Sequence, residues 1–260
     1  MLHKLGSLLW FGAGALVTTA AARLRPRGRA LRPGHTLDPA LAVGNRGSAV
    51  ASGASNGGRV YTVVLTGGPC GGKSSSLEHF TRELRARGYD VYCAPEVPTI
   101  MMNGGCVFPG PDAGYRTIAF ESALMKLQLQ MEESFLQVAR SAGHDAVVVF
   151  DRGVLDMAAY MTDTLLKEVL ADLGCSEKEL LRRYDCVLHL VTAAKGAEAF
   201  YTTANNATRT ETVDEAAALD DRVREAWIKH PRHIVVGNEG TFAQKMSQGT
   251  QHILELVRAK

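Results

Sequence analysis

The chain has 260 residues, of which 46% are hydrophobic, and this is enough to fill the core of one domain of about 200 residues. The formal net charge is +2, but seven of the 29 basic residues precede residue 59, where Asp38 is the only acid. Residues 59–260 therefore carry 22 basic and 26 acidic side chains, a net charge of −4, without a basic run. This charge pattern excludes a nucleic-acid-binding surface in that part of the chain. The five cysteines form no C-x-x-C pair, which excludes a zinc site of that kind and indicates a reducing compartment.

Residues 1–58 are predicted to form a hydrophobic and basic targeting or anchor segment followed by a linker. Residues 5–22 carry no charge, and five arginines follow between positions 23 and 32. One interpretation is a membrane anchor at residues 5–22 whose C-terminal flank faces the cytosol. A second is a transit peptide, cleaved on entry into a mitochondrion or plastid. A third is a disordered extension of no consequence, so the N-terminal extension is expected to be either helical or disordered. Residues 33–58, rich in Gly, Ala, Ser and Pro, are typical of a flexible linker.

A phosphate-binding motif follows the β-rich stretch at residues 60–66. Residues 67–74 fit G-x-x-x-x-G-K-[ST], in which the glycines turn backbone N–H groups inward and the next helix offers its unpaired N–H groups. Lys73 is predicted to reach the β- and γ-phosphates, and Ser74 to bind Mg²⁺. The predicted nucleotide-contacting residues are Gly67, Gly68, Pro69, Cys70, Gly71, Gly72, Lys73, Ser74 and Ser75.

The rest of the chain alternates between helical and strand patterns. We expect helices at 74–87, 115–142, 154–173, 176–183, 213–228 and 241–258, and further strands at 90–94, 146–150, 186–191 and 233–236. A Gly-rich loop is expected at 103–114. Five strands alternating with helices predict a doubly wound parallel α/β sheet in residues 59–260.

Charged residues follow the second and third strands, at the edge of the sheet where ligands of such folds bind. Glu96 follows the second strand, and Asp151 and Arg152 follow the third. Asp151 is predicted to hold Mg²⁺, although it could instead only cap the next helix. Arg152 is predicted to pair with phosphate oxygens, with a surface acid as the alternative partner.

A segment after the fourth strand, residues 192–209, is predicted to act as a lid. A closing lid excludes water, so that the phosphoryl group reaches an acceptor and not solvent. Arg209 in this segment is a candidate to neutralise charge on the transferring group.

Several segments together resemble one known family: VVLTGGPCGGKSS, APEVPT, VVVFDRG, YDCVLHLVTAAKGAEAFYTTANNATR and LDDRVREAWIKHP. They cover most of residues 59–258 and are similar to the AAA-type P-loop domain shared by the NadR proteins and the TRPL-translocation-defect proteins. The resemblance implies a fold of the nucleoside- and nucleotide-kinase-like type that binds ATP or GTP. It also implies that Asn238 lies where the nucleobase rests.

Two functions follow from this resemblance. The NadR-type domain resembles a ribosylnicotinamide kinase, which implies a Mg²⁺-dependent kinase for a nucleoside-like acceptor, with Glu96 orienting or deprotonating the acceptor hydroxyl. The TRPL-translocation-defect type resembles a GTP-binding regulator of membrane trafficking with affinity for acidic phospholipids, and such a protein has no metabolite substrate. A membrane anchor favours the regulator, and a transit peptide favours the kinase.

Overall fold

The structure is a computed structural model that describes residues 57–201 and 212–259. The predicted membrane contact at residues 5–22 and the candidate Arg209 lie outside these described residues. None of the helices within them has the length and apolar character needed to cross a bilayer.

The predicted five-stranded parallel sheet is confirmed. Its strands are β1 (Val60–Thr66), β2 (Asp90–Ala94), β3 (Ala146–Asp151), β4 (Cys186–Leu190) and β5 (His233–Val236). They lie in the order β2-β3-β1-β4-β5, and each neighbouring pair is parallel. The strand that runs into the phosphate-binding motif is therefore at the centre of the sheet.

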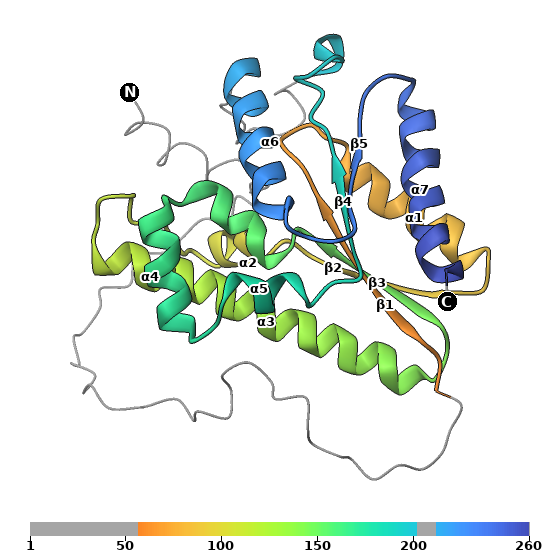
Figure 1. The fold of residues 1–260 in the computed structure, drawn as a ribbon, viewed down its shortest axis with the longest axis horizontal. Helices are drawn as coiled ribbons and strands as arrows, with labels where there is room; N and C mark the ends of the chain where they lie inside the picture. Colours follow the sequence, from red (N-terminus) through yellow and green to blue (C-terminus); the bar gives the residue numbers. More distant parts are fainter. Residues whose placement is uncertain (1–56, 202–211, 260) are drawn as a thin grey trace, which may run out of the picture.

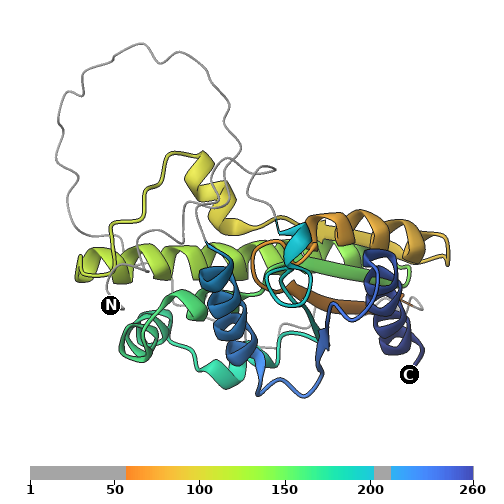
Figure 2. The ribbon, with the colours of Figure 1, turned by 90° about the horizontal axis from the view of Figure 1, so that it is seen from above.

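Helices cover both faces of this sheet. They are α1 (Lys73–Arg85), α2 (Val97–Asn103), α3 (Tyr115–Ala142), α4 (Asp163–Leu173), α5 (Glu177–Leu181), α6 (Val213–Trp227) and α7 (Phe242–Arg258), with 3₁₀ helices η4 (Val154–Tyr160) and η5 (Glu198–Phe200). Figure 1 shows α1 and α7 on one side of the sheet and α3, α4 and α5 on the other. Figure 2, turned by 90°, shows the same two layers from above.

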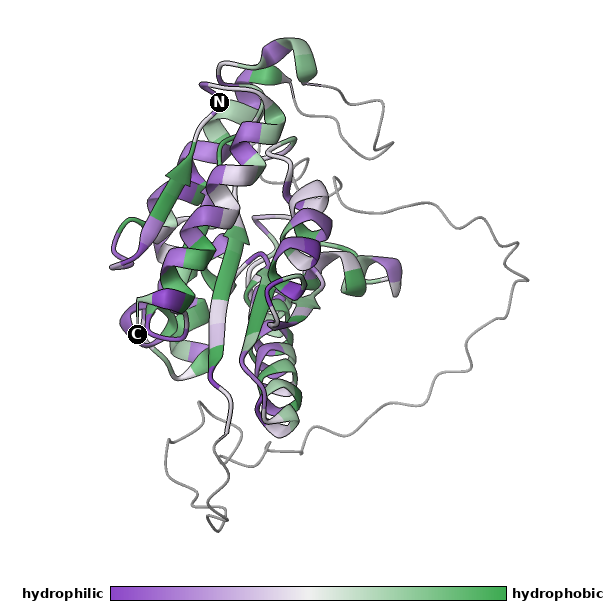
Figure 3. Cartoon of the chain, turned by 90° about the vertical axis from the view of Figure 1, so that its right-hand side faces the viewer, coloured by the Kyte–Doolittle hydropathy of each residue, from purple (hydrophilic) through white to green (hydrophobic). Residues whose placement is uncertain are grey.

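The strands read as continuous apolar runs because both of their faces are buried. In β3, Val147 and Val149 join the core under α1 and α7, whereas Val148 and Phe150 join the core under α3. This alternation is the two-residue period of a strand. In Figure 3 the strands are mostly hydrophobic, and the helices around them show mixed hydrophilic and hydrophobic residues.

The structure corrects two expectations about helices. The single helix predicted at 154–173 is wrong: η4 and α4 are separated at Met161, whose backbone is extended, and the Thr162 side chain accepts a hydrogen bond from Leu165 N at 3.2 Å to start α4. The apolar period continues across this break and hides it. Helix α2 was not predicted, and it begins at Val97 with Pro98 in its first turn, where proline is tolerated.

Helix α3 is much longer than the strand that follows it. Its 28 residues span about 42 Å, whereas the six residues of β3 span about 20 Å. The chain reverses direction between them at Gly143, which has a left-handed φ of 73°. The N-terminal half of α3 consequently extends past the carboxyl edge of the sheet, and the helices that contact α3 are α4, α2 and η4.

Candidate nucleotide-binding site

The phosphate-binding loop has a backbone that only glycine accommodates at its two ends. Gly67 has a φ of 130°, and a Cβ atom there would lie 2.1 Å from the carbonyl oxygen of Leu190. Gly72 has a φ of 91°, and its Cβ would lie 2.7 Å from the ring of Phe242. The glycines of the motif therefore let the loop pack directly against β4 and α7 while its N–H groups stay available for an anion.

Residues outside the motif hold the first half of this loop in place. One oxygen of Asp220, in α6, accepts hydrogen bonds from Gly68 N at 2.8 Å and from Thr192 N at 3.1 Å. The Thr192 hydroxyl donates to the carbonyl of Pro69, and Ala193 N donates to the carbonyl of Cys70 at 3.2 Å. The segment after β4 and helix α6 thus fix the loop together.

Asp220 remains ionised although it is only 1% exposed. Its buried carboxylate also contacts His189 Nε2 at 3.1 Å and Lys195 Nζ at 3.3 Å. Burial alone would raise its pKa, but the hydrogen bond and charge of His189, together with Gly68 N and Lys195, lower the pKa to about 2. Sequence reasoning missed this residue; its only signal was its place in the LDDRV segment of the resemblance.

Lys73 lies inside the loop, as predicted, and its ammonium group folds back on the loop itself. Its Nζ donates to the carbonyl oxygens of Gly67 and Gly68 at 2.8 and 2.9 Å. Burial, and then the positive charge of Arg152, lower its pKa to about 8. To reach a phosphate, Lys73 would exchange these two neutral acceptors for a charged one, an exchange that favours phosphate.

Asp151 is a carboxylate that suits a metal ion. It pairs with Leu65 of β1, so it lies beside the strand that enters the loop. No hydrogen bond reaches its side chain within the described part of the chain, and burial followed by the charge of Glu96 raises its pKa to about 6. A cation beside it would offset both effects.

The metal ion that fits is Mg²⁺. The described residues contain no group of three His, Cys, Asp or Glu side chains that could hold a metal. Mg²⁺ needs none, because it keeps several waters and binds through one or two protein oxygens plus phosphate oxygens. The Ser74 hydroxyl, exposed in the first turn of α1 beside Ser75, and the Asp151 carboxylate would supply those oxygens.

Glu96 and Arg152 form an ion pair at the carboxyl edge of the sheet. Arg152 Nε lies 2.5 Å from Glu96 Oε1, and the Thr99 hydroxyl donates to Glu96 Oε2 at 2.9 Å. Burial would raise the pKa of Glu96, but the charges of Arg152 and Lys73 hold the pKa below its usual value. Glu96 is consequently an anion at neutral pH with both of its oxygens oriented.

Arg152 is held more tightly than a surface arginine. Its side chain is 15% exposed, and its Nη1 lies 3.5 Å from Asp156. Its φ of 70° is unusual for a residue other than glycine, and its N–H donates to the carbonyl of Leu65 at 3.0 Å. Backbone strain of this kind is found at functional sites. The contact of Arg152 with phosphate stays a prediction, and the structure shows its pairing with Glu96 and Asp156.

Asn238 follows β5, and its amide group is engaged by the protein. Its Nδ2 donates to the carbonyls of Thr192 and Lys195 at 2.8 and 2.7 Å, and its Oδ1 accepts from Lys245 Nζ at 2.7 Å. Both amide hydrogens are therefore used to fix the segment after β4. The predicted nucleobase contact of Asn238 stays a prediction, and it would use the remaining lone pair of Oδ1.

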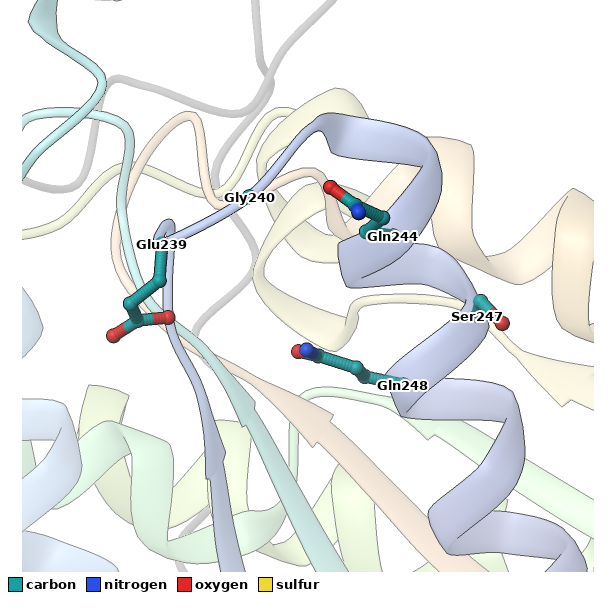
Figure 4. A pocket seen from close by; sticks show the side chains of 5 residues that line it. All are labelled: Glu239, Gly240, Gln244, Ser247 and Gln248. Carbon is teal, nitrogen blue, oxygen red and sulfur yellow. The ribbon is translucent and has the colours of Figure 1, made fainter.

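A separate hollow of about 350 Å³ lies beside helix α7. Figure 4 shows Gln244 and Gln248 extending from α7 on one side of it and Glu239 on the loop opposite. Among the described residues that line it, Glu239 is the one charged side chain, and because it is an acid the hollow does not suit a phosphate group. Sequence reasoning singled out none of its residues.

The protein-family model described as an AAA domain matches residues 62–245. This match begins in β1 and ends in the first turn of α7, so it includes the phosphate-binding loop, Glu96, Asp151, Arg152 and Asn238. No curated protein matches the chain.

Proposed function

Because the chain belongs to the AAA-domain family, in which a P-loop domain binds a nucleotide, we propose that it is a Mg²⁺-dependent kinase. It transfers a phosphoryl group from ATP or GTP to the hydroxyl of a small, nucleoside-like acceptor. The observation that carries this proposal is the oriented carboxylate of Glu96, held by Arg152 beside the lysine of the phosphate-binding loop. Hydrolysis by a switch protein needs no such second carboxylate.

Each residue of the site has a part in the proposed reaction. The N–H groups of the loop and Lys73 bind the phosphates, and Ser74 and Asp151 hold Mg²⁺, which neutralises charge on the phosphate oxygens. Arg152 orients Glu96 and adds positive charge near the transferring group. Arg209 belongs to the proposed lid.

Glu96 accepts the proton of the acceptor hydroxyl. Its lowered pKa makes it a weak base, but it guarantees the ionised form at neutral pH. In a loose transition state the hydroxyl loses its proton late, so orientation of the acceptor matters more than base strength. The hydrogen bonds from Thr99 and Arg152 supply this orientation.

The test is Glu96→Gln in the full chain, incubated with labelled ATP and GTP and a panel of nucleosides, nucleotides and lipids. Transfer should fall about 10²- to 10⁴-fold, whereas stabilisation by nucleotide should persist. Glu78→Gln, on the exposed face of α1, is the matched control and should transfer normally. If wild-type protein phosphorylates nothing in the panel but hydrolyses nucleotide, and Glu96→Gln leaves hydrolysis unchanged, the kinase proposal is wrong.

The alternative is a nucleotide-dependent regulator that binds acidic phospholipids at a membrane facing the cytosol. The feature that favours it is the uncharged stretch at residues 5–22 with the five arginines that follow. Under this alternative, full-length protein should sediment with vesicles that contain phosphatidic acid or phosphoinositide, and only in one nucleotide state. A form shortened at its N-terminus inside a mitochondrion or plastid would favour the kinase.

A further inference from the structure

Glu121, in the N-terminal half of α3, is a buried acid without a partner. Glu121 is 1% exposed, and its side-chain oxygen Oε2 has no hydrogen bond within the described part of the chain. Nor does any ion pair involve it there. A buried polar group in this condition costs free energy, so its presence calls for an explanation.

Two other buried polar residues of α3, Gln128 and Glu132, are paired. Gln128 Nε2 donates to Glu132 at 3.0 Å and to the Arg152 carbonyl at 3.2 Å. Glu132 also accepts from the Tyr184 hydroxyl at 2.7 Å and from Arg183 Nε at 3.0 Å. Glu121 lacks such partners, and among the described residues of α3 only the Oγ of its neighbour Ser122 is likewise buried without a hydrogen bond.

The position of Glu121 relates it to the acceptor side of the site. The hydrogen bond from Gln128 to the Arg152 carbonyl shows that Gln128 of α3 lies beside the carboxyl edge of the sheet. Glu121 lies seven residues earlier on the same face, which is two turns or about 10 Å toward the N-terminus of α3. Because this half of α3 extends past the carboxyl edge, Glu121 lies over the ligand side of the sheet and not within the sheet core.

Helix α3 contacts α4 and the two elements that start from the Glu96–Arg152 pair. Helix α2 begins directly after Glu96, and η4 begins two residues after Arg152. Both contact α3. Glu96 and Arg152 thus lie at the start of two of the elements that pack against α3, the helix that carries Glu121.

The chemistry of Glu121 differs from that of Glu96. Burial alone raises its pKa to about 8, with no charged neighbour contributing. At neutral pH the group is therefore mainly the neutral acid, which presents one O–H donor beside one carbonyl acceptor. An amide or lactam edge, with an N–H beside a C=O, is complementary to this pair of groups.

Building on the proposed kinase function, we propose that Glu121 recognises the acceptor by pairing with an amide or lactam edge, while the acceptor's hydroxyl lies at Glu96. The acceptor class is then a nucleoside-like molecule with such an edge on its ring. A phospholipid headgroup that lacks this edge would not satisfy Glu121.

The experiment measures acceptor binding by the full chain with a non-hydrolysable nucleotide and Mg²⁺. The probes are uridine and inosine, which carry a lactam edge, and methyl riboside, which has the same sugar without the ring. Glu121→Met should weaken binding of the lactam ribosides at least tenfold and leave methyl riboside unchanged. Glu121→Gln should bind them within a few fold of wild type, because its amide also presents a donor beside an acceptor. Glu133→Gln, on the exposed face of α3, is the control and should behave as wild type.

Three results would overturn the inference. The first is that wild-type protein binds neither uridine nor inosine. The second is that the Glu121→Met variant binds the lactam ribosides as tightly as wild type and has a higher Tm, because Glu121 would then be a core residue without a role in binding. The third is that wild-type protein prefers a riboside with a cationic ring and that Glu121→Gln abolishes this preference, since Glu121 would then bind as an anion. If wild type binds the lactam ribosides in a Glu121-dependent way but phosphorylates neither, the kinase proposal fails and the recognition stands.

Discussion

Lys73 illustrates a residue whose contacts within the protein are weaker than those it would make with a ligand. In the part of the chain that the structure describes, its ammonium group bonds to two main-chain carbonyls of its own loop and to no other group, so Lys73→Ala should leave the fold intact. Nucleotide binding should be lost, because no other side chain would reach the β- and γ-phosphates from this loop. The rise in Tm on adding millimolar ATP or GTP measures this, since a bound ligand stabilises by RT ln(1 + [L]/Kd). Absence of any rise in wild-type protein would contradict nucleotide binding itself.

Asp151 gives a prediction about pH. Its pKa is about 6 in the folded chain and near 3.8 in the unfolded chain, so between these values the folded state binds more protons. Stability contributed by the protonated carboxyl is fully present below pH 3.8 and is lost as pH rises through 6. Asp151→Asn removes this loss, so without ligand the variant should have a higher Tm than wild type at pH 7.

The same substitution should have the opposite effect when Mg²⁺ and nucleotide are present. Wild type should bind Mg-nucleotide better as pH rises through 6, whereas the affinity of Asp151→Asn should be weaker and flat in this range. Titrations at pH 5 and pH 7.5 check both parts. Equal pH dependence in the two proteins would contradict the role of Asp151.

Among the elements, α6 is the one that stabilises the phosphate-binding loop from outside the motif. Asp220→Ala leaves Gly68 N and Thr192 N without their acceptor in a buried place, which costs about 1–3 kcal/mol for each group. We expect a loss of about 2–4 kcal/mol in the free energy of unfolding and weaker nucleotide binding. Denaturant unfolding with and without nucleotide measures both.

The next residue in α6 is a matched control for this prediction. Within residues 57–201 and 212–259, the one partner that Asp221 shares with Asp220 is Lys195, and the side chain of Asp221 is 57% exposed. Asp221→Ala should change the free energy of unfolding by about 0.5 kcal/mol or less. Similar losses in both variants would mean that the charge of Lys195, and not the bond to the loop, is what Asp220 contributes.

The elements also show where sequence patterns succeed. The phosphate-binding loop is predictable because its backbone requires a positive φ at some positions, as at Gly67 and Gly72, and glycine adopts this conformation most readily. The strands are predictable because burial on both faces leaves an unbroken apolar run. The break at Met161 was hidden, because a continuing apolar period cannot reveal a local change of backbone direction.

The side chains that depend on distant contacts were the ones that sequence reasoning missed. Asp220 is 152 residues from the loop N–H that it binds, and no spacing rule connects the two. Glu121 has no motif either, and its distinction is burial without a partner, which only the fold reveals. The predicted Asn238 occupies its expected place after β5, but its bonds to the main chain are a property of the packed structure.

At the scale of the whole molecule, the domain begins close to the predicted boundary at residue 59. Gly58 N donates to the Gly143 carbonyl at 3.0 Å, and a Cβ atom at Gly58 would lie 1.9 Å from the main chain of His144. The chain is therefore packed against the turn before β3 from residue 58 onward. Every residue placed in the site except Arg209 lies within the described part of this domain.

Removal of residues 1–56 should consequently leave a folded domain with unchanged nucleotide affinity. It keeps the bond from Gly58 to Gly143, and it removes no strand of the sheet and no residue of the site. The test compares full-length and shortened protein for Tm with and without Mg-nucleotide, and for recovery in the membrane fraction after carbonate washing. If nucleotide raises the Tm of both proteins equally and only the full-length chain is recovered with membranes, the N-terminal segment serves in anchoring alone. A smaller nucleotide shift in the shortened protein would show that residues 1–56 take part in the site, and it would contradict the division of the chain into a targeting segment and an independent nucleotide-binding domain.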